Sequence, residues 1–339
     1  MKKVIIIVVV VVLAALGLFL YGGYQHFSKE IAAMQSVEEV GEGVFTLHYK
    51  GDYGFKGFLE QGGAKTDAEM ATYIAGFLSH GYYKPQVTTP EGGCTTVSGG
   101  KVFGRNFDWD HAGNYIILHT DPEEGYASIA TSNLSFLGFG EDWKPQSMQE
   151  KFMAMAAVYV PLDGMNEKGL CVADLIEIDG DTDVPDTEKP DLTIVGAIRL
   201  VLDYAADVEE AIGLLSQYDV FPSVSRMHHL SLSDLSGHSV VVEWEGGELK
   251  ATPTQVVTNH CLSEVSNSES ITESLRRFNM LNTEYLPVAD STKAQQAIQA
   301  ASYPSGTLWT VIYNQQTLTA THFSGCEWEQ PLTNTLSDN

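Results

Sequence analysis

The residue best suited to chemistry is Cys94, which follows two glycines and opens a predicted strand. If the peptide bond between Gly93 and Cys94 were cut, the new α-amine would be a base within reach of the thiol of the same residue. A free α-amine has a pKa of about 7.7–8.0 and a thiol about 8.5, so the amine is well matched to activate the thiol as a nucleophile. Cys94 could make the cut itself, because its thiol can attack the Gly93 carbonyl to give a thioester that water hydrolyses. We therefore interpret Gly93-Cys94 as an autocleavage site.

Two charged residues come soon after this cysteine. A hairpin predicted around Gly99-Gly100 would bring Arg105 and Asp108 back beside Cys94. Asp108 would then accept hydrogen bonds from the new α-amine, and Arg105 would favour the thiolate electrostatically. The alternative is a buried cysteine that packs as a small hydrophobic residue, with Arg105 and Asp108 as a surface ion pair. The residue types alone leave both interpretations open.

A series of short motifs continues this pattern in order along the chain, from Cys94 to about residue 323. The motifs are Cys94-Thr95-Thr96, Gly104-Arg105-Asn106-Phe107-Asp108-Trp109, Gly164-Met165-Asn166-Glu167-Lys168-Gly169-Leu170, Asp234-Leu235-Ser236-Gly237 before Val240-Val241-Val242-Glu243, Val257-Thr258-Asn259-His260 and Leu308-Trp309-Thr310-Val311. With these motifs the chain resembles the linear amide C–N hydrolases. These are N-terminal-nucleophile enzymes that include choloylglycine (bile salt) hydrolases, penicillin V acylases and the isopenicillin N acyltransferase group.

The resemblance implies a fold, a reaction and a set of site residues. The implied fold is a four-layer αββα sandwich of the α+β class, and the implied reaction is hydrolysis of an amide by a processed N-terminal cysteine without a cofactor. The catalytic residues carried over by position are Cys94, Arg105, Asp108, Asn259 and Arg277.

The same resemblance assigns the oxyanion donors. Asn259 matches the asparagine whose side-chain amide donates to the oxyanion, an interaction that is often worth about 3–4 kcal/mol. The second donor is a backbone N–H that falls near Ile176, where the side chain is free to vary. Arg277 matches a late arginine of the family, with Arg276 as the competing choice, because only one of two adjacent helical residues faces inward.

The expected substrate is a small N-acyl amide of the bile-salt, penicillin or N-acyl amino acid type. Two features weaken a bile-salt assignment: 93 residues precede Cys94, and 17 residues separate Asn259 from Arg277, too few for the insertion that bile salt hydrolases use in tetramer assembly. The long leader is more similar to the acyltransferase branch, in which the cut leader stays as a subunit. Acyl transfer to an amine is therefore one alternative function, and a non-catalytic binding protein on the same fold is another.

Residue spacing assigns neither a metal site nor a disulfide. His228-His229 and Asp110-His111 have no partner at zinc-site spacing, and the acidic loop from Asp179 lacks the glycine and glutamate of a calcium-binding EF-hand. The sequence therefore predicts no metal. It leaves open whether Cys171, Cys261 and Cys326 are buried thiols or include one disulfide.

The elements that must position these residues are predicted from hydrophobic periodicity and caps. Helices are expected at 66–79, 192–217 with a break near Ala206 and a cap at Asp207, 270–284 with a capping box at Ser270, and 292–301. Strands are expected at 44–49, 94–98, 102–107, 115–119, 127–131, 156–161, 170–177, 229–232 and 239–244, with a last hairpin within 308–323. This order predicts a sheet-rich α+β layout with helices on the outer faces.

The N-terminal segment predicts where the protein is located. Residues 4–21 carry no charge and follow two lysines, and eighteen residues of helix span about 27 Å, close to the hydrocarbon thickness of a bilayer. We interpret residues 1–24 as an uncleaved membrane anchor, with a cleaved signal peptide as the alternative. Residues 25–93 form a leader block and 94–339 the amidohydrolase domain. The catalytic part is then extracytoplasmic, either anchored in the membrane or secreted.

Composition excludes two other classes of protein. The chain has 339 residues of which 44% are hydrophobic, too many for a disordered protein. Its 44 acidic and 19 basic residues give a formal charge of −25, which would repel phosphate backbones and excludes nucleic-acid binding as the main function.

Overall fold

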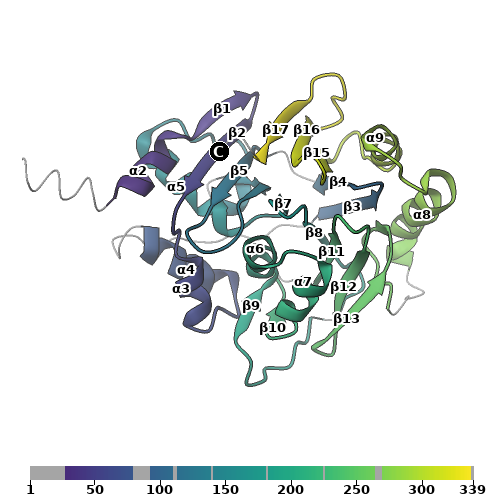
Figure 1. Cartoon of the computed structure of the whole chain (residues 1–339), viewed down its shortest axis with the longest axis horizontal. Helices are drawn as coiled ribbons and strands as arrows, with labels where there is room; N and C mark the ends of the chain where they lie inside the picture. Colours follow the sequence, from purple (N-terminus) through teal and green to yellow (C-terminus); the bar gives the residue numbers. More distant parts are fainter. Residues whose placement is uncertain are drawn as a thin grey trace, which may run out of the picture.

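Two β-sheets packed face to face form the centre of the molecule, and helices cover their outer faces (Figure 1). The computed structural model describes residues 27–78, 92–109, 113–138, 140–180, 182–223, 226–263 and 269–336. The arrangement is the mixed α+β sandwich that the sequence predicted. The predicted anchor at 4–21 lies outside the described residues. Across the described ranges, no helix combines the length and apolar character that crossing a bilayer requires.

The larger sheet has nine strands, and its neighbouring strands are antiparallel except for one parallel pair. Its order is β1 (Glu38–Gly41), β2 (Val44–Lys50), β5 (Tyr115–Asp121), β6 (Ser128–Asn133), β7 (Asp163–Asn166), β8 (Cys171–Ile176), β11 (His228–Ser233), β12 (Ser239–Glu245) and β13 (Glu248–Pro253). The parallel pair is β2 with β5. Strands from before and after Cys94 therefore belong to one sheet.

The smaller sheet has six antiparallel strands and carries Cys94. Its order is β14 (Val256–Val257), β3 (Gly92–Gly99), β4 (Val102–Trp109), β15 (Thr307–Asn314), β16 (Thr319–Ser324) and β17 (Leu332–Thr335). The hairpin between β3 and β4 turns through Gly100 and Lys101, whose φ angles of 55° and 63° are those of a two-residue type I′ turn. A separate parallel pair joins β9 (Asp191–Thr193) to β10 (Asp219–Phe221).

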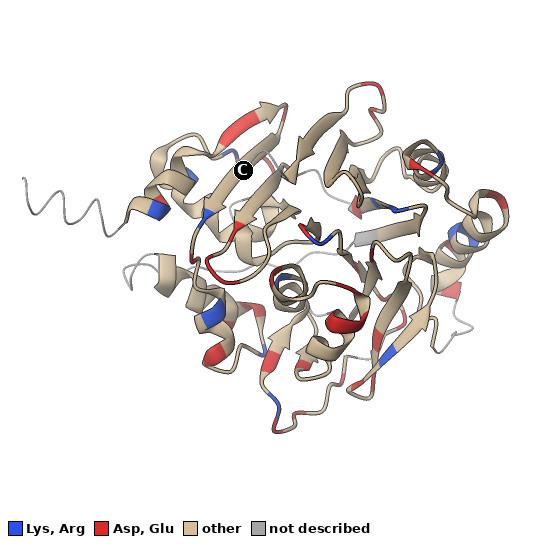
Figure 2. Ribbon diagram, viewed as in Figure 1, with Lys and Arg blue, Asp and Glu red and all other residues tan. Residues whose placement is uncertain are grey.

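Different helices cover the two sheets. α6 (Ile194–Tyr204) packs on β7 and β8, α7 (Val208–Leu215) reaches β12, and α9 (Ser291–Ala300) packs on β3, β4 and β15. The chain also forms α2 (Ser28–Gln35), α3 (Phe55–Glu60), α4 (Asp67–Leu78), α5 (Met148–Ala154) and α8 (Thr272–Met280). Acidic residues are distributed along the whole ribbon and not gathered in one element (Figure 2).

Strand β4 explains how the sheet is held between two apolar layers. All eight of its residues are buried, and its side chains alternate between the two faces. Phe103 and Phe107 belong to the core between the sheets, whereas Val102 packs in the cluster under α9. Gly104 lies beneath the same helix, where an added Cβ would come within 3.0 Å of Ile298.

Most predicted elements are confirmed, and two local predictions are wrong. The hairpin of β3 and β4 and the break between α6 and α7 are as predicted, and the Asp207 side chain caps α7. Residues 156–161, predicted as a strand, lie largely in a 3₁₀ helix (Met155–Tyr159) against the larger sheet. The predicted capping box at Ser270 is absent because α8 begins after Ile271 without a side-chain cap, and Glu273 pairs with Arg276 instead.

The block that precedes Cys94 is expected to contribute to the stability of the whole protein. Leu47, in β2, is fully buried in the core. Leu47→Ala should therefore lower the free energy of unfolding by about 2–5 kcal/mol, measured by urea denaturation. Val40→Ala is the control, since Val40 on the edge strand β1 is 40% exposed. Equal, small effects of the two changes would contradict the integration of this block.

Candidate active site

Three atoms of Cys94 are each contacted by a different residue that the sequence predicted for the site. The backbone N–H donates to Asn259 Oδ1 at 3.0 Å, and the carbonyl oxygen accepts from Arg277 Nη1 at 2.8 Å. The sulfur lies 3.5 Å from Arg105 Nη2. Cys94 is 3% exposed. Residues far apart in the sequence thus converge on one cysteine.

Arg105 reaches the sulfur because of the hairpin register. Thr96 pairs with Arg105 and Cys94 pairs with Phe107, so all four side chains lie on the sheet face that meets the larger sheet. Arg105 is fully buried. The alternative in which Arg105 and Asp108 form a surface ion pair is wrong, because alternation along β4 places these two side chains on opposite faces of the sheet.

Two carboxylates that sequence reasoning missed neutralise Arg105. Its Nη1 lies 2.5 Å from Asp163 Oδ2, and its Nη2 lies 3.0 Å from Asp174 Oδ1. Asp163 also accepts hydrogen bonds from Trp309 Nε1 at 3.0 Å and from the Tyr313 hydroxyl at 2.6 Å. Both aspartates come from strands of the larger sheet, β7 and β8. The available signal was their type, an acidic residue within otherwise apolar strand segments.

Asp108 is a buried carboxylate with one oxygen left over. Its Oδ1 accepts from the Thr307 hydroxyl at 2.6 Å, while its Oδ2 has no hydrogen-bond partner among the residues the structure describes. Burial raises the pKa of Asp108 to about 6, although the Thr307 hydrogen bond and Arg277 oppose the shift. The register pairs Gly93 with Asp108, so this carboxylate belongs beside the predicted cleavage site.

Asn259 and Ile176, the predicted oxyanion donors, are in direct contact. Asn259 Nδ2 donates to the Ile176 carbonyl at 2.9 Å, while Asn259 Oδ1 accepts from Cys94 and from Arg277 Nη2 at 2.9 Å. The contact therefore uses the carbonyl of Ile176 and not its N–H. In the β8–β11 register, the Ile176 N–H points away from β11 and toward the β7 side of β8. On that side, β7 pairs only with residues 171–173 and does not reach Ile176. Its role as a donor stays a prediction.

The structure distinguishes the two candidate arginines. Arg277 is 3% exposed and its guanidinium contacts the Cys94 carbonyl, the Thr95 hydroxyl and Asn259. Arg276 instead forms an exposed ion pair with Glu273 at 2.6 Å. Arg277 is thus the one that faces the site.

The thiol itself is poorly ionised in the uncut chain. The pKa of Cys94 is raised to about 12, mainly by burial, which outweighs the opposing charge of Arg105; Asp174 and Asp108 add to the increase. A backbone hydrogen bond from Asp108 also favours the thiolate, but these contributions do not outweigh burial. In this form the sulfur is a protonated thiol at neutral pH.

The remaining candidates have other partners. His228 Nδ1 lies 2.9 Å from Asp174 Oδ2, so a histidine considered as a metal ligand instead adjoins the Arg105 network. His229 lies beside Glu177 and Glu243. Asp110-His111 and Asp181 lie outside the described residues. All four cysteines are free thiols.

The buried network around Asp163 yields a stability prediction. Asp163→Asn would remove the negative charge that compensates Arg105. It would also place the NH₂ group of the asparagine against groups that donate hydrogen bonds to Asp163. We therefore expect the free energy of unfolding to fall by about 3–5 kcal/mol. Asp186→Asn is the control, because Asp186 pairs with Lys65 at 2.5 Å with its side chain 61% exposed, and should cost under about 1 kcal/mol. Chemical denaturation of both variants makes the comparison, and a similar cost for the two would contradict the role of Asp163.

Comparison with known proteins shows which family this chain is related to. The family described as linear amide C–N hydrolases, choloylglycine hydrolase family, matches residues 94–268. Penicillin V acylase from Pectobacterium atrosepticum is 35% identical over 96 residues, which span 25% of this chain and 26% of that relative.

One solved structure shares the fold of this chain. A mutant conjugated bile acid hydrolase from Clostridium perfringens has a TM-score of 0.52 at 16% identity, covering 73% of this chain and 93% of that one. Penicillin V acylase from Agrobacterium tumefaciens has a TM-score of 0.47 at 20% identity, covering 71% and 84%. The family match begins at Cys94 and covers more than half of the residues of this chain. This chain therefore belongs to the choloylglycine hydrolase family of linear amide C–N hydrolases.

Proposed function

We propose that this protein is an autoprocessing amidohydrolase that uses Cys94 as an N-terminal nucleophile to cleave the linear C–N bond of a small N-acyl amide. The observation that carries the proposal is that the nitrogen, oxygen and sulfur of Cys94 contact Asn259, Arg277 and Arg105 respectively. Any buried backbone N–H and carbonyl needs a hydrogen-bond partner, but here both partners are polar side chains. A cysteine that served only as a small apolar residue would not need a guanidinium beside its sulfur. The family match supports the same reaction class.

Autoprocessing is the first reaction in this proposal. The Cys94 sulfur attacks the Gly93 carbonyl carbon, the C–N bond breaks, and the thiol proton goes to the leaving nitrogen. Water then hydrolyses the thioester, which releases a carboxylate at Gly93 and restores the thiol. The products are a leader that ends at Gly93 and a chain that begins with a free α-amine at Cys94.

Turnover of the substrate repeats this chemistry with the new amine as the base. The amine takes the thiol proton, the sulfur attacks the acyl carbon, and the proton passes to the leaving amine. Asn259 Nδ2 and the Ile176 N–H are the proposed donors to the oxyanion. Asn259 Nδ2 carries two hydrogens, so it can donate one to substrate while the other stays on the Ile176 carbonyl. Asp108, with its spare oxygen, is the proposed acceptor for the α-ammonium.

The proposed substrates are acylated amines with an apolar acyl part. A panel of conjugated bile salts, penicillin V, N-acyl amino acids and N-acyl lactones tests this class, with release of the free amine as the readout. Detection of the free acid indicates hydrolysis, whereas a new amide formed with an added amine indicates acyl transfer.

We further propose that the leader stays bound after the cut and that residues 4–21 anchor the protein on the outer side of a membrane. The first part is supported by the buried side chains that the leader contributes through β2, such as Phe45 and Leu47. The second part is supported by the uncharged stretch that follows Lys2 and Lys3.

Removal of the nucleophile is the central test. Cys94→Ala should yield one unbroken chain by intact-mass measurement and lower amide turnover by more than about 10⁴-fold, because both reactions need the sulfur. Wild-type protein should yield a fragment whose N-terminus is Cys94. Cys326→Ala is the matched control, since Cys326 is only partly buried and its thiol contacts the Tyr303 carbonyl and none of the proposed catalytic residues, so this variant should keep cleavage and turnover. Full activity of Cys94→Ala would exclude the mechanism.

The two adjacent arginines offer a second matched pair. Arg277→Lys removes the planar guanidinium that donates hydrogen bonds to Cys94, Thr95 and Asn259. We therefore expect kcat/KM to fall by about 10–100-fold. Arg276→Lys should leave kcat/KM unchanged because Arg276 is exposed. Equal effects of the two substitutions would show that Arg277 does not position Cys94 and Asn259.

A further inference from the structure

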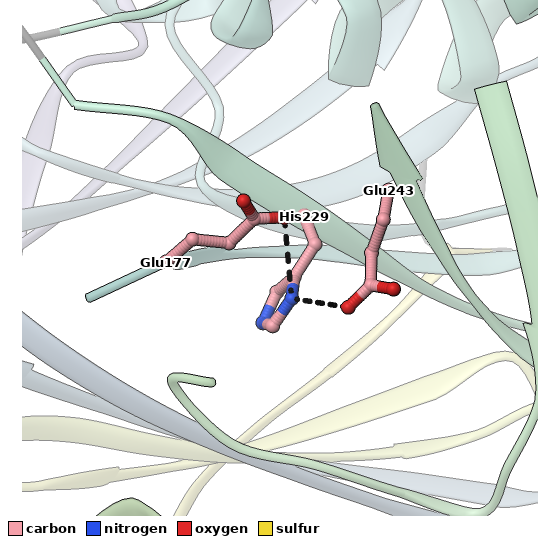
Figure 3. A group of neighbouring side chains, drawn as sticks. All are labelled: Glu177, His229 and Glu243. Carbon is pink, nitrogen blue, oxygen red and sulfur yellow. Dashed lines mark hydrogen bonds and ion pairs between the residues drawn. The ribbon is translucent and has the colours of Figure 1, made fainter. Parts of the chain in front are cut away.

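Three ionisable side chains meet in the interior on the larger sheet. Glu177 follows β8, His229 lies in β11 and Glu243 in β12, and they are 3%, 0% and 1% exposed. Figure 3 shows the three side chains pointing toward one another. Their nearest nitrogen and oxygen atoms all lie within 4.8 Å of each other. Two carboxylates and an imidazole in a buried space require a compensating cation.

The tautomer of His229 is fixed by its surroundings. Its Nε2 lies 2.7 Å from the carbonyl oxygen of Thr258, which only accepts hydrogen bonds, so Nε2 carries a proton. Its Nδ1 faces Glu243 Oε1 at 3.3 Å and Glu177 Oε1 at 3.5 Å. In the neutral ring, Nδ1 is an acceptor, so three acceptor atoms converge on one point. A proton or a metal ion must lie between them.

The charge balance favours a metal ion over a proton. A proton on His229 leaves the two carboxylates with one negative charge in excess, whereas a divalent ion neutralises both. Within the described part of the chain, Glu177 Oε1 has no hydrogen-bond partner although Glu177 is 97% buried, so this oxygen has a free lone pair in the cluster.

The geometry matches a tetrahedral metal site. Zn²⁺ binds nitrogen and oxygen ligands at about 2.0–2.2 Å, and the edges of a tetrahedron of that size are about 3.3–3.6 Å long. These edges agree with the separations of His229 Nδ1 from the two glutamate oxygens, 3.3 and 3.5 Å. A histidine whose other N–H donates to a backbone carbonyl is the usual arrangement of a metal ligand.

Glu243 is also held in place for binding. Its Oε1 accepts from the Leu262 N–H at 2.7 Å and its Oε2 from the Ser263 N–H at 2.9 Å. These bonds fix the carboxylate orientation, as outer-shell hydrogen bonds do for metal-binding carboxylates. The ligands come from β11, from β12 and from the residue that follows β8, which explains why no short sequence spacing indicated them.

We propose that Glu177, His229 and Glu243 form a binding site for a divalent metal ion, with Zn²⁺ as the best match and water as the fourth ligand. The ion is structural: Glu177 directly follows Ile176, and Thr258, which accepts from His229, directly precedes Asn259. It therefore ties together the two segments that carry the proposed oxyanion donors. The site does not depend on cleavage at Cys94.

The test uses the full chain, both as wild type and as Cys94→Ala, so that metal binding is measured apart from processing and turnover. After incubation with Zn²⁺ and dialysis, elemental analysis should find about one equivalent per chain in both proteins, and the melting temperature should rise with Zn²⁺ and fall with a chelator. The wild-type measurement decides the question even if a ligand variant fails to fold. Absence of stoichiometric Zn²⁺ with an unchanged melting temperature would overturn the proposal and leave a proton as the cation.

Variants separate this cluster from surface binding. Glu177→Gln keeps the shape but removes the charge, and should weaken Zn²⁺ binding by more than about 10-fold and abolish the thermal shift. The control is Asp186→Asn, because Asp186, Asp191 and Asp219 form a second acidic group of which Asp186 is exposed. Loss of bound Zn²⁺ in Asp186→Asn but not in Glu177→Gln would assign the ion to the surface and overturn the proposal.

Discussion

The buried charge of Arg105 is the constraint on which the site depends. Arg105 belongs to the smaller sheet, and its partners Asp163 and Asp174 belong to the larger one, so this ion pair network crosses the interface between the sheets. A guanidinium in an apolar interior is tolerated only when its charge and its hydrogen bonds are matched. The two sheets must therefore pack in one alignment. That alignment holds the guanidinium in place, while the hairpin register within the smaller sheet brings it beside the Cys94 sulfur.

The same network limits what Arg105 can do for the thiol. Because two carboxylates already share the guanidinium, little net positive charge remains to stabilise a thiolate, and burial keeps the pKa of Cys94 at about 12. The uncut chain thus has the nucleophile and its polar partners but no base matched to the thiol. In the proposed reaction the cut supplies that base, because it converts an amide N–H bonded to Asn259 into an amine.

Sequence patterns predicted the local features of the structure and missed the contacts between strands that are distant in the sequence. The Gly99-Gly100 turn and the Asp207 cap are short-range signals, and the elements next to them formed as predicted. Residues 156–161 are apolar without a clear period, and tertiary packing made them a 3₁₀ helix. Family resemblance grouped Cys94, Asn259 and Arg277. The positions of Asp163 and of the Glu177–His229–Glu243 cluster depend instead on the order of strands in the sheet, which the spacing of residues in the sequence does not indicate.

The leader and the substrate have the same chemical relationship to Cys94. In the uncut chain, Gly93 is an acyl group joined to the Cys94 nitrogen by a linear amide bond, and β3 holds it in register with Asp108. The strand fixes this bond within the sheet, so the proposed processing reaction starts from an oriented amide. Once the bond is cut, Gly92 and Gly93 are no longer covalently tied to Cys94, and the position above the sulfur can accept another acyl group. In the proposed mechanism one set of donors then acts on the precursor and on the substrate, because both reactions develop negative charge on a carbonyl oxygen at the same sulfur.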